Sequence, residues 1–355
     1  MPAQGMWSHK YHLDGRRSEN ESVPHSDVYY SLNVLLGLSE VRAALIDEPY
    51  DVSALFSMLS AALLVRPVRN GAWGMALWAA AELDLDTPGL VADRLWSLAA
   101  DPNVASGWTA QDLGLSVSGA SAQARRDRSW RPLAAGLARL LYERFRGPGA
   151  LVRDSSRGAR RYFATFASQV YAALAFYHYG ELAEDTVMLS AANAIAAKLI
   201  TLQGPFGEWP WFYSPGGDSV IEAYEVYSVH QHGMGPAFLH HAVRHGVPGA
   251  REALVRGFEW IFGANLMQRS MLLPKLSLIY RSQARRGFAG RRSGRLVRAA
   301  AVATKRADPW GADPTKLRLT QEMRSYELGW LLWSFAGRTD YPELTQRRDF
   351  LLGTC

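Results

Sequence analysis

The sequence contains a single cysteine among 355 residues, Cys355 at its C-terminus. One cysteine forms no intrachain disulfide, which excludes a disulfide-stapled extracellular scaffold and fits a reducing compartment. The N-terminal segment, residues 1–22, is polar and has no continuous apolar stretch of the kind that a secretory signal needs. These two features predict a cytoplasmic location.

Long apolar runs are missing too. The longest, residues 52–65, contains three serines and is shorter than the roughly 20 residues that cross a bilayer, so no membrane span is predicted. No segment alternates apolar and polar residues between hairpin turns, and we therefore expect essentially no β-sheet. No glycine-rich phosphate loop, nucleophile elbow or Ser-His-Asp order occurs, which disfavours nucleotide-dependent and serine-hydrolase chemistry.

What is present is the composition of a globular protein, 48% hydrophobic and 20% charged. At this length about three quarters of the surface of the unfolded chain can be buried, so a large core is possible without staples. Twelve tryptophans are compatible with an aromatic-lined cleft, because indole rings offer flat faces to a ligand; packing in the core is the competing role.

The net charge of +6 is unevenly distributed, because no acid lies between Glu259 and Asp308. We expect an extended or weakly ordered insertion at about 270–318, beside the cleft. Such a stretch suits an anionic ligand, and a solvated surface loop is the alternative; no nucleic-acid partner is expected. Its cations are Arg281, Arg285, Arg286, Arg291, Arg292, Arg295, Arg298, Lys305 and Arg306.

Apolar residues recur at helical spacing from Asp27 to the end of the chain. Helix-start signals such as Thr87 before Pro88 precede several of these stripes. About twelve helices in short-linked pairs predict an all-α fold, in which six hairpins close an (α/α)6 toroid. The alternative is an open solenoid, but no repeat of constant length occurs. We predict an N-terminal extension, residues 1–26, and a single toroid domain, residues 27–355, whose first and last helices meet.

One connection, from Gln203 to Asp218 and on to His232, is too long and too rich in aromatics and acids for a simple turn. Glycine and proline fix its path, and its carboxylates, tyrosines and histidines could exchange protons with a ligand. The predicted catalytic residues are Glu208, Glu222, Tyr227 and His230. The predicted substrate-binding residues are Trp209, Trp211, Tyr213, Tyr224, His232, Arg324 and Glu327.

Each of these assignments has a structural alternative. Trp209 and Trp211 could be core residues, and Arg324 with Glu327 could be an intrahelical ion pair. His230 and His232 lack the i,i+4 spacing of helical zinc ligands, so neither a metal nor a cofactor is predicted. The histidines at positions 240, 241 and 245 are expected on the surface.

The segment Gln203-Gly-Pro-Phe-Gly-Glu-Trp209 resembles the Gln…Gly-x-Trp pattern of terpenoid cyclases and protein prenyltransferase β-subunits. The resemblance implies an α/α-toroid fold in which the glutamine caps a helix and the tryptophan packs back on it. The pattern occurs once, and the Asp-x-Asp-Asp and Asp-Asp-x-x-Asp motifs of the cyclases are absent. An isoprenoid-handling enzyme is therefore an alternative function.

The run Gly207-Glu-Trp-Pro-Trp-Phe-Tyr213 resembles the Gly-Trp-Pro loop of uronyl C5-epimerases. Those enzymes, polysaccharide lyases and six-hairpin glycosidases place Trp, Tyr, His and carboxylates on a toroid. The resemblance implies an enzyme acting on an anionic or uronate-containing glycan by epimerisation, elimination or hydrolysis. Proton abstraction beside a uronate needs a base, an opposing acid and a cation. The third possibility is a noncatalytic binding or assembly protein of a biosynthetic pathway. The sequence predicts no oligomeric state.

Overall fold

The computed structural model describes residues 5–13, 24–41, 51–66, 68–87, 89–101, 107–290 and 292–347. Helices make up 61% of the structure, which confirms the prediction of a mainly helical chain. Within the described ranges there are thirteen α-helices. No helix in these ranges is both long enough and apolar enough to cross a membrane.

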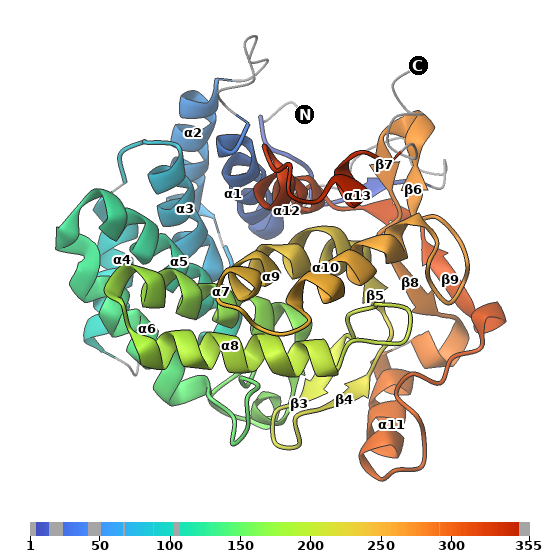
Figure 1. The fold of residues 1–355 in the computed structure, drawn as a ribbon. Coiled ribbons are helices and arrows are strands. Elements are labelled where there is room, and N and C mark those ends of the chain that lie inside the picture. Colours follow the sequence, from blue (N-terminus) through green and yellow to red (C-terminus); the bar gives the residue numbers. More distant parts are fainter. Residues whose placement is uncertain are drawn as a thin grey trace.

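Six helices form an inner ring (Figure 1), in which each packs against the next and the first packs against the last. The ring confirms the predicted toroid and the predicted meeting of its first and last helices. Its members are α1 (Pro24–Ser39), α3 (Gly71–Glu82), α5 (Ala110–Arg126), α7 (Phe166–Ala183), α9 (Gly235–Arg244) and α12 (Tyr326–Phe335).

Six outer helices alternate with the inner ones along the chain. The first five pack against the inner helix that precedes them, and the last packs against α10. They are α2 (Val52–Val65), α4 (Gly89–Ala100), α6 (Arg131–Phe145), α8 (Thr186–Thr201), α10 (Ala250–Glu259) and α13 (Pro342–Thr345).

Glycines allow the inner helices to approach closely, and capping residues fix where these helices begin. A Cβ atom at Gly37 of α1 would collide with the backbone of Gly329 in α12, so the ring closes where neither helix has a side chain. Helix α5 begins with a capping box, in which Thr109 and Asp112 satisfy each other's backbone N–H groups. Helix α7 begins at the cap Thr165, whose side chain accepts from the N–H of Ser168.

Four small antiparallel sheets occur in the long connections, so the expectation of essentially no sheet is wrong there. Their strands have only two to four residues, too few for an alternating pattern to be visible in the sequence. The pairings are β2 (Ala164–Thr165) with β3 (Phe212–Ser214) and β4 (Ser219–Glu222), β5 (Val226–Tyr227) with β8 (Ser282–Arg285) and β9 (Leu317–Thr320), β1 (Tyr11–His12) with β10 (Glu322–Met323), and β6 (Leu272–Leu273) with β7 (Leu278–Ile279).

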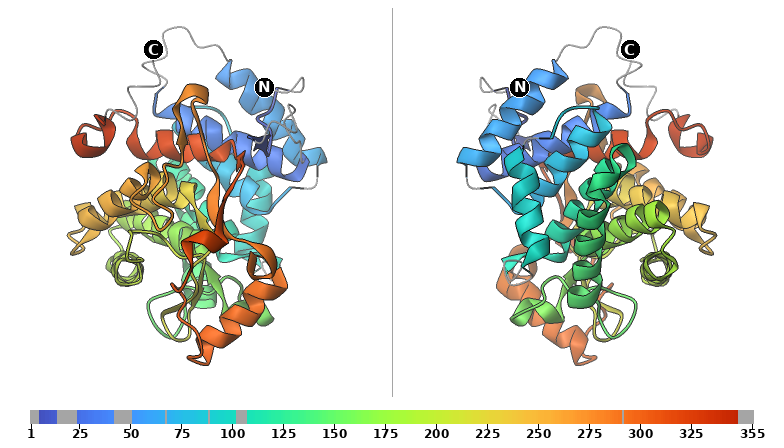
Figure 2. Two further views of the ribbon diagram at one scale, coloured as in Figure 1. Left: turned by 90° about the vertical axis from the view of Figure 1, so that its right-hand side faces the viewer. Right: turned by 90° about the vertical axis from the view of Figure 1, so that its left-hand side faces the viewer.

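The arginine-rich segment is more regular than expected. Its first part is strand β8, but Arg292–Ala303 forms helix α11, which packs on β4 and projects at the lower edge of the molecule (Figures 1 and 2). Ion pairs from Arg298 to Glu222, a predicted catalytic residue, and from Arg295 to Glu225 hold this helix in place. The expectation of weak order is therefore wrong. Arg291 and the side chain of Arg292 lie outside the described residues.

Candidate functional site

A cavity of about 230 Å³ lies where the N-terminal ends of the inner helices meet. All six positions of the ring contribute through a helix or the residues just before it, so the cavity exists only because the ring is closed. Aromatic rings form most of its wall, and Arg69, Gln111, Thr165, His230 and Arg281 add polar groups. The aromatic residues are Tyr29, Tyr30, Tyr171, Trp211, Tyr227 and Tyr326.

His230 begins η5 (His230–Met234), a π-helical turn that leads into α9. Its ring lies 4.7 Å from that of Phe166 and 5.2 Å from that of Tyr227, and it is parallel to Trp211. The side chain is 4% exposed, and Nδ1 has no hydrogen-bond partner among the described residues. Burial, with a smaller effect of Arg281, lowers the pKa of His230 to about 3. The imidazole is therefore neutral near physiological pH.

Tyr227 presents its ring to the same cavity from strand β5. Its hydroxyl donates a 3.0 Å hydrogen bond to Oε2 of Glu225. Glu225 also accepts from Ser282 and Thr320 and lies 3.8 Å from the Arg295 guanidinium. Burial, followed by the charge of Glu225, raises the pKa of Tyr227. Glu225 belongs to the predicted connection but was not among its predicted catalytic or binding residues, and it lies just before β5.

Two arginines of the cavity wall supply positive charge. The guanidinium of Arg281 lies 4.9 Å from the ring centre of Tyr227 and is ion-paired with Glu322. The guanidinium of Arg69 lies 5.2 Å from the ring centre of Tyr29. Arg69 forms no ion pair with any residue that the structure describes, and its charge is therefore available to an anion.

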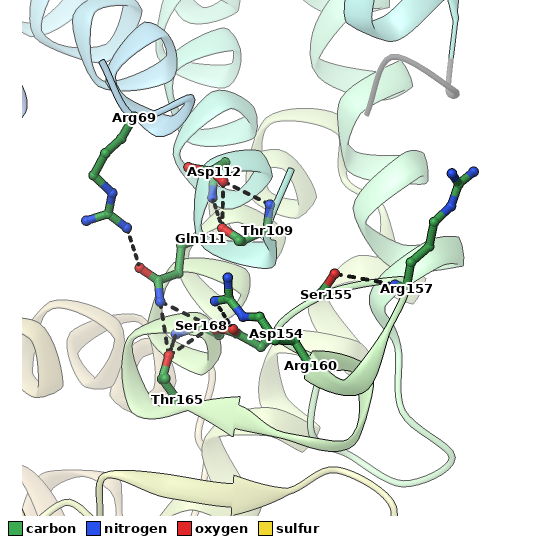
Figure 3. Close-up of polar contacts among 10 residues, drawn as sticks. All are labelled: Arg69, Thr109, Gln111, Asp112, Asp154, Ser155, Arg157, Arg160, Thr165 and Ser168. Atoms are coloured by element: carbon green, nitrogen blue, oxygen red, sulfur yellow. Dashed lines mark hydrogen bonds and ion pairs between the residues drawn. The ribbon is translucent and has the colours of Figure 1, made fainter. Parts of the chain in front are cut away.

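A hydrogen-bond network anchors the Arg69 side of the cavity (Figure 3). Arg69 donates to Oε1 of Gln111, and Nε2 of Gln111 donates 3.0 Å to the hydroxyl of Thr165. Beyond Thr165, Ser168 donates to the buried Asp154, which also pairs with Arg160. The network links the ends of two inner helices, so the position of Arg69 depends on the packing of α5 against α7.

The structure places the two predicted catalytic carboxylates outside this cavity. Oε2 of Glu208 accepts a 2.8 Å hydrogen bond from the N–H of Phe206, within its own turn. Glu222 is fully buried on β4, where its carboxylate oxygens lie 3.4 Å from Arg285 and 3.6 Å from Arg298. Burial raises the pKa of both acids. Glu222 thus anchors the arginine-rich segment.

The predicted substrate-binding residues separate into one cavity residue and several core residues. Trp211 lines the cavity, whereas Tyr213 and Tyr224 are buried away from it. Nδ1 of His232 lies 2.6 Å from the carbonyl oxygen of Ser228, a contact that orients this buried ring. Their roles in ligand binding stay predictions.

Arg324 and Glu327 do not form the ion pair that their spacing allowed. Arg324 pairs with Glu322 at 2.7 Å and contacts His9. Glu327 is buried, and neither of its carboxylate oxygens has a partner among the described residues. Burial raises the pKa of Glu327 well above its ordinary value.

Trp209 is a core residue that packs on Phe166 of α7 and Phe238 of α9. Its indole is fully buried and stacks on Phe166 with 5.3 Å between ring centres. Gln203 fixes the turn by donating 2.8 Å hydrogen bonds to the carbonyl oxygens of Gly207 and Ala253. Of Trp209, Trp211, Tyr227 and His230, only the last three line the central cavity.

Replacing Trp209 with Ala should lower the free energy of unfolding by about 3–5 kcal/mol, because it leaves a large hole in a packed core. Trp211→Ala is the matched control, since its side chain is partly exposed and borders the cavity. We expect it to cost much less stability and to weaken ligand binding instead. Urea unfolding of both variants measures the difference, and equal losses would contradict the distinction.

His240 corrects a further expectation, because it is buried and not on the surface. Its Nε2 lies 2.8 Å from the carbonyl oxygen of Ser334, and burial lowers its pKa to about 3. His241 and His245 are half-buried and both contact Glu181 at 2.9 Å. The helix α9 thus turns one histidine inward between α12 and α13 and two toward α7.

Buried neutral histidines predict acid sensitivity. Burial lowers the pKa of His232 to about 4 and that of His240 to about 3, from 6.5. The unfolded chain therefore binds more protons below pH 6.5, and stability falls as the pH drops from 6.5 toward 4, by about 1.4 kcal/mol per pH unit for each fully neutral histidine. Urea unfolding at several pH values in this range should show this fall in the free energy of unfolding. His240→Gln should lower the slope by the contribution of one histidine, about 1.4 kcal/mol per pH unit. An unchanged slope would contradict the assignment.

No metal site stands out in the described part of the chain, where no three His, Cys, Asp or Glu side chains are grouped as ligands. The polar groups of the cavity are instead suited to an organic anion. Two guanidinium groups provide charge, six aromatic rings provide flat faces, and the neutral imidazole of His230 provides a group that can take up a proton.

No protein-family model matches the chain, and no curated protein matches its sequence. Solved structures do match. The cellobiose 2-epimerase from Bacillus thermoamylovorans B4167 is 11% identical with a TM-score of 0.53, over 74% of this chain and 81% of the epimerase. An unsaturated glucuronyl hydrolase from Bacillus sp. GL1, responsible for the degradation of glycosaminoglycan, is 10% identical with a TM-score of 0.55, over 94% of each chain. The protein has the (α/α)6-toroid fold of these enzymes.

Proposed function

We propose that the protein is a carbohydrate-active enzyme that removes the proton next to the carboxylate of a uronic acid unit, and so catalyses epimerisation or elimination. One observation carries the proposal. The neutral imidazole of His230 lines a cavity at the centre of the ring, together with Tyr227 and Arg281. Base, acid and cation thus come together, as this chemistry requires.

Each of the three groups has a defined part. The neutral His230 accepts the proton from the carbon beside the carboxylate. Arg281, with Arg69 as the second arginine of the cavity, neutralises the carboxylate as negative charge develops on it. Tyr227, held by Glu225, donates a proton to the carbon in epimerisation, or to the leaving oxygen in elimination.

The low pKa of His230 in the free protein is consistent with this assignment. Burial and the charge of Arg281 both disfavour the imidazolium. A substrate carboxylate that pairs with Arg281 offsets the second effect, and its own negative charge favours the imidazolium further. Substrate binding therefore raises the pKa of the base toward the working pH, where general bases are most effective.

The alternatives fit the cavity less well. Glycoside hydrolysis commonly uses two carboxylates flanking the scissile bond. No carboxylate lines this cavity among the described residues, and Glu225 and Asp154 beside it are each engaged by several donors. An isoprenoid carbocation would be repelled by Arg69 and Arg281. The two matching structures, an epimerase of cellobiose and a hydrolase of unsaturated glucuronyl compounds, support a sugar as the occupant. A cytoplasmic location stays a prediction.

The test is isotope exchange. The full chain is incubated in D₂O with methyl β-D-glucuronide and with uronate polymers, and NMR follows deuterium at C5, the carbon beside the carboxylate. We expect deuterium at C5 of at least one uronate and none in methyl β-D-glucoside, which has no carboxylate. Absence of exchange and of unsaturated product across the uronates would overturn the proposal.

Arg69→Gln tests the anion directly. The guanidinium is not ion-paired within the described residues, so its loss should raise KM or Kd for a uronate by about 10–100-fold, with little effect on folding. Affinity for a neutral glycoside should hardly change. Arg66→Gln is the control, because Arg66 is three residues away and does not line the cavity. Equal affinities of the wild type and Arg69→Gln for uronates would show that Arg69 does not bind the carboxylate.

A further inference from the structure

A second and larger hollow adjoins the central cavity. Its volume is about 560 Å³, and it shares the lining residues Thr165 and Trp211 with the cavity that contains His230. The two spaces therefore meet at these side chains. A ligand unit in the central cavity could continue past Trp211 into this outer groove.

The walls of the outer groove are mainly carbon. One wall is α11, which contributes Leu296 and Ala299. The other is formed by Phe163, before α7, and by Phe212 and Ile221 of the β3–β4 pair. Leu296 is 58% exposed and presents its side chain as part of this apolar wall.

The polar side chains of the outer groove already have partners within the protein. Asp154 accepts from Ser168 and pairs with Arg160. Thr165 is engaged by Gln111 and Ser168, and Arg295 lies 3.8 Å from Glu225. A second sugar unit would need many hydrogen bonds from these groups, whereas an apolar group needs only the exposed carbon surface.

We infer that the outer groove binds an apolar aglycone, and that the substrate is a glycoside in which an acidic sugar unit is attached to an alkyl or aryl group. This inference rests on the proposed function, because the acidic unit is the part held by Arg69 and Arg281. The ion pairs of α11 to Glu222 and Glu225 fix the wall that carries Leu296, so the groove is formed before the ligand arrives.

The experiment measures Kd by calorimetry for methyl, butyl and hexyl β-D-glucuronides, each below its micelle-forming concentration. A fully buried methylene group tightens binding roughly fourfold, so hexyl should bind at least about tenfold more tightly than methyl. The heat capacity change of binding should become more negative along the series, since apolar surface is buried.

Two surface variants on one helix locate the effect. Leu296→Ser should remove most of the gain between methyl and hexyl, while leaving the Kd of the methyl compound unchanged. Val297→Ser is the matched control, because Val297 is 62% exposed on α11 and does not line the groove. Val297→Ser should leave the Kd values of all three glucuronides as they are in the wild type.

The outcomes separate this inference from the proposed function. If Kd does not depend on chain length, or if Leu296→Ser has no effect on the gain, the aglycone groove is refuted while uronate binding stands. If hexyl glucoside binds as tightly as hexyl glucuronide, the acidic anchor is refuted and the groove stands. If a disaccharide with a terminal glucuronic acid binds more tightly, relative to methyl glucuronide, than hexyl glucuronide does, the groove is a sugar subsite and the inference fails. Failure of every glycoside to bind refutes both.

Discussion

Replacing His230 with Gln should reduce the rate of C5 deuterium exchange by about 10²–10⁴-fold, the usual contribution of a general base. Glutamine keeps a polar side chain of similar reach but does not accept a proton near neutral pH. Because the Nδ1 of His230 has no hydrogen-bond partner among the described residues, the substitution removes none that this atom makes with them. The melting temperature should therefore change little, and Kd for the substrate should stay within a few fold.

His232→Gln provides the control for this result. His232 is on the same π-helical turn and equally buried, but it faces the carbonyl oxygen of Ser228 and does not line the cavity. We expect the His232→Gln variant to be somewhat less stable than the wild type and to exchange deuterium at C5 at the wild-type rate. A His230→Gln variant with a wild-type rate would remove the base from the proposal, and equal rate losses in both variants would indicate a general disturbance of the turn.

The ring of helices could be predicted because its signals are local. Apolar stripes such as Phe166, Val170 and Leu174 repeat with the helical period, and caps such as Thr165 mark where the helices begin. The short strands were not predicted, because a strand such as Val226–Tyr227 is too short to show a period. Helix α11 was not predicted either, because its many arginines suggest a solvated loop. Ion pairs to Glu222 and Glu225 hold this helix in place.

The candidate site could be predicted only as far as one segment of chain supplies it. Trp211, Tyr227 and His230 come from the predicted loop and line the cavity. Tyr29, Arg69 and Tyr171 come from far earlier in the sequence and reach the same space only because the ring closes. No local pattern marks them, since each is an ordinary residue at the end or on the inner face of a helix.

The predicted carboxylates illustrate the opposite error. Glu208 and Glu222 stand among glycines, prolines and aromatics, a composition typical of ligand-binding loops. The chain instead folds back at Gly204–Gly207, where Glu208 accepts from the N–H of Phe206, and β4 then buries Glu222 beside the N–H of Tyr224 and Arg285. Composition identified the segment, but the strand pairing decided which side chains face the cavity.

Replacing Tyr227 with Phe should also lower the exchange or turnover rate by about 10²–10⁴-fold, because it removes the proposed acid and keeps the ring. Phenylalanine preserves the packing against Trp211 and His230 and the contact with Arg281. Glu225 keeps Ser282, Thr320 and Arg295 as partners, so the loss of one 3.0 Å hydrogen bond should cost only about 1 kcal/mol of stability.

The double variant His230→Gln with Tyr227→Phe decides whether the two groups act together. Residues that act as a unit in one step give grossly non-additive losses. The double variant should therefore be only slightly slower than the slower single variant, instead of showing the product of both effects. Glu208→Gln is the control, since Glu208 lies outside the cavity and glutamine still accepts from the N–H of Phe206.

If Tyr227→Phe exchanges deuterium at the wild-type rate but forms no epimer, Tyr227 acts only in reprotonation, on the face opposite His230. If it retains both activities, another tyrosine of the cavity, such as Tyr29 with its 3.1 Å contact to Tyr171, supplies the proton.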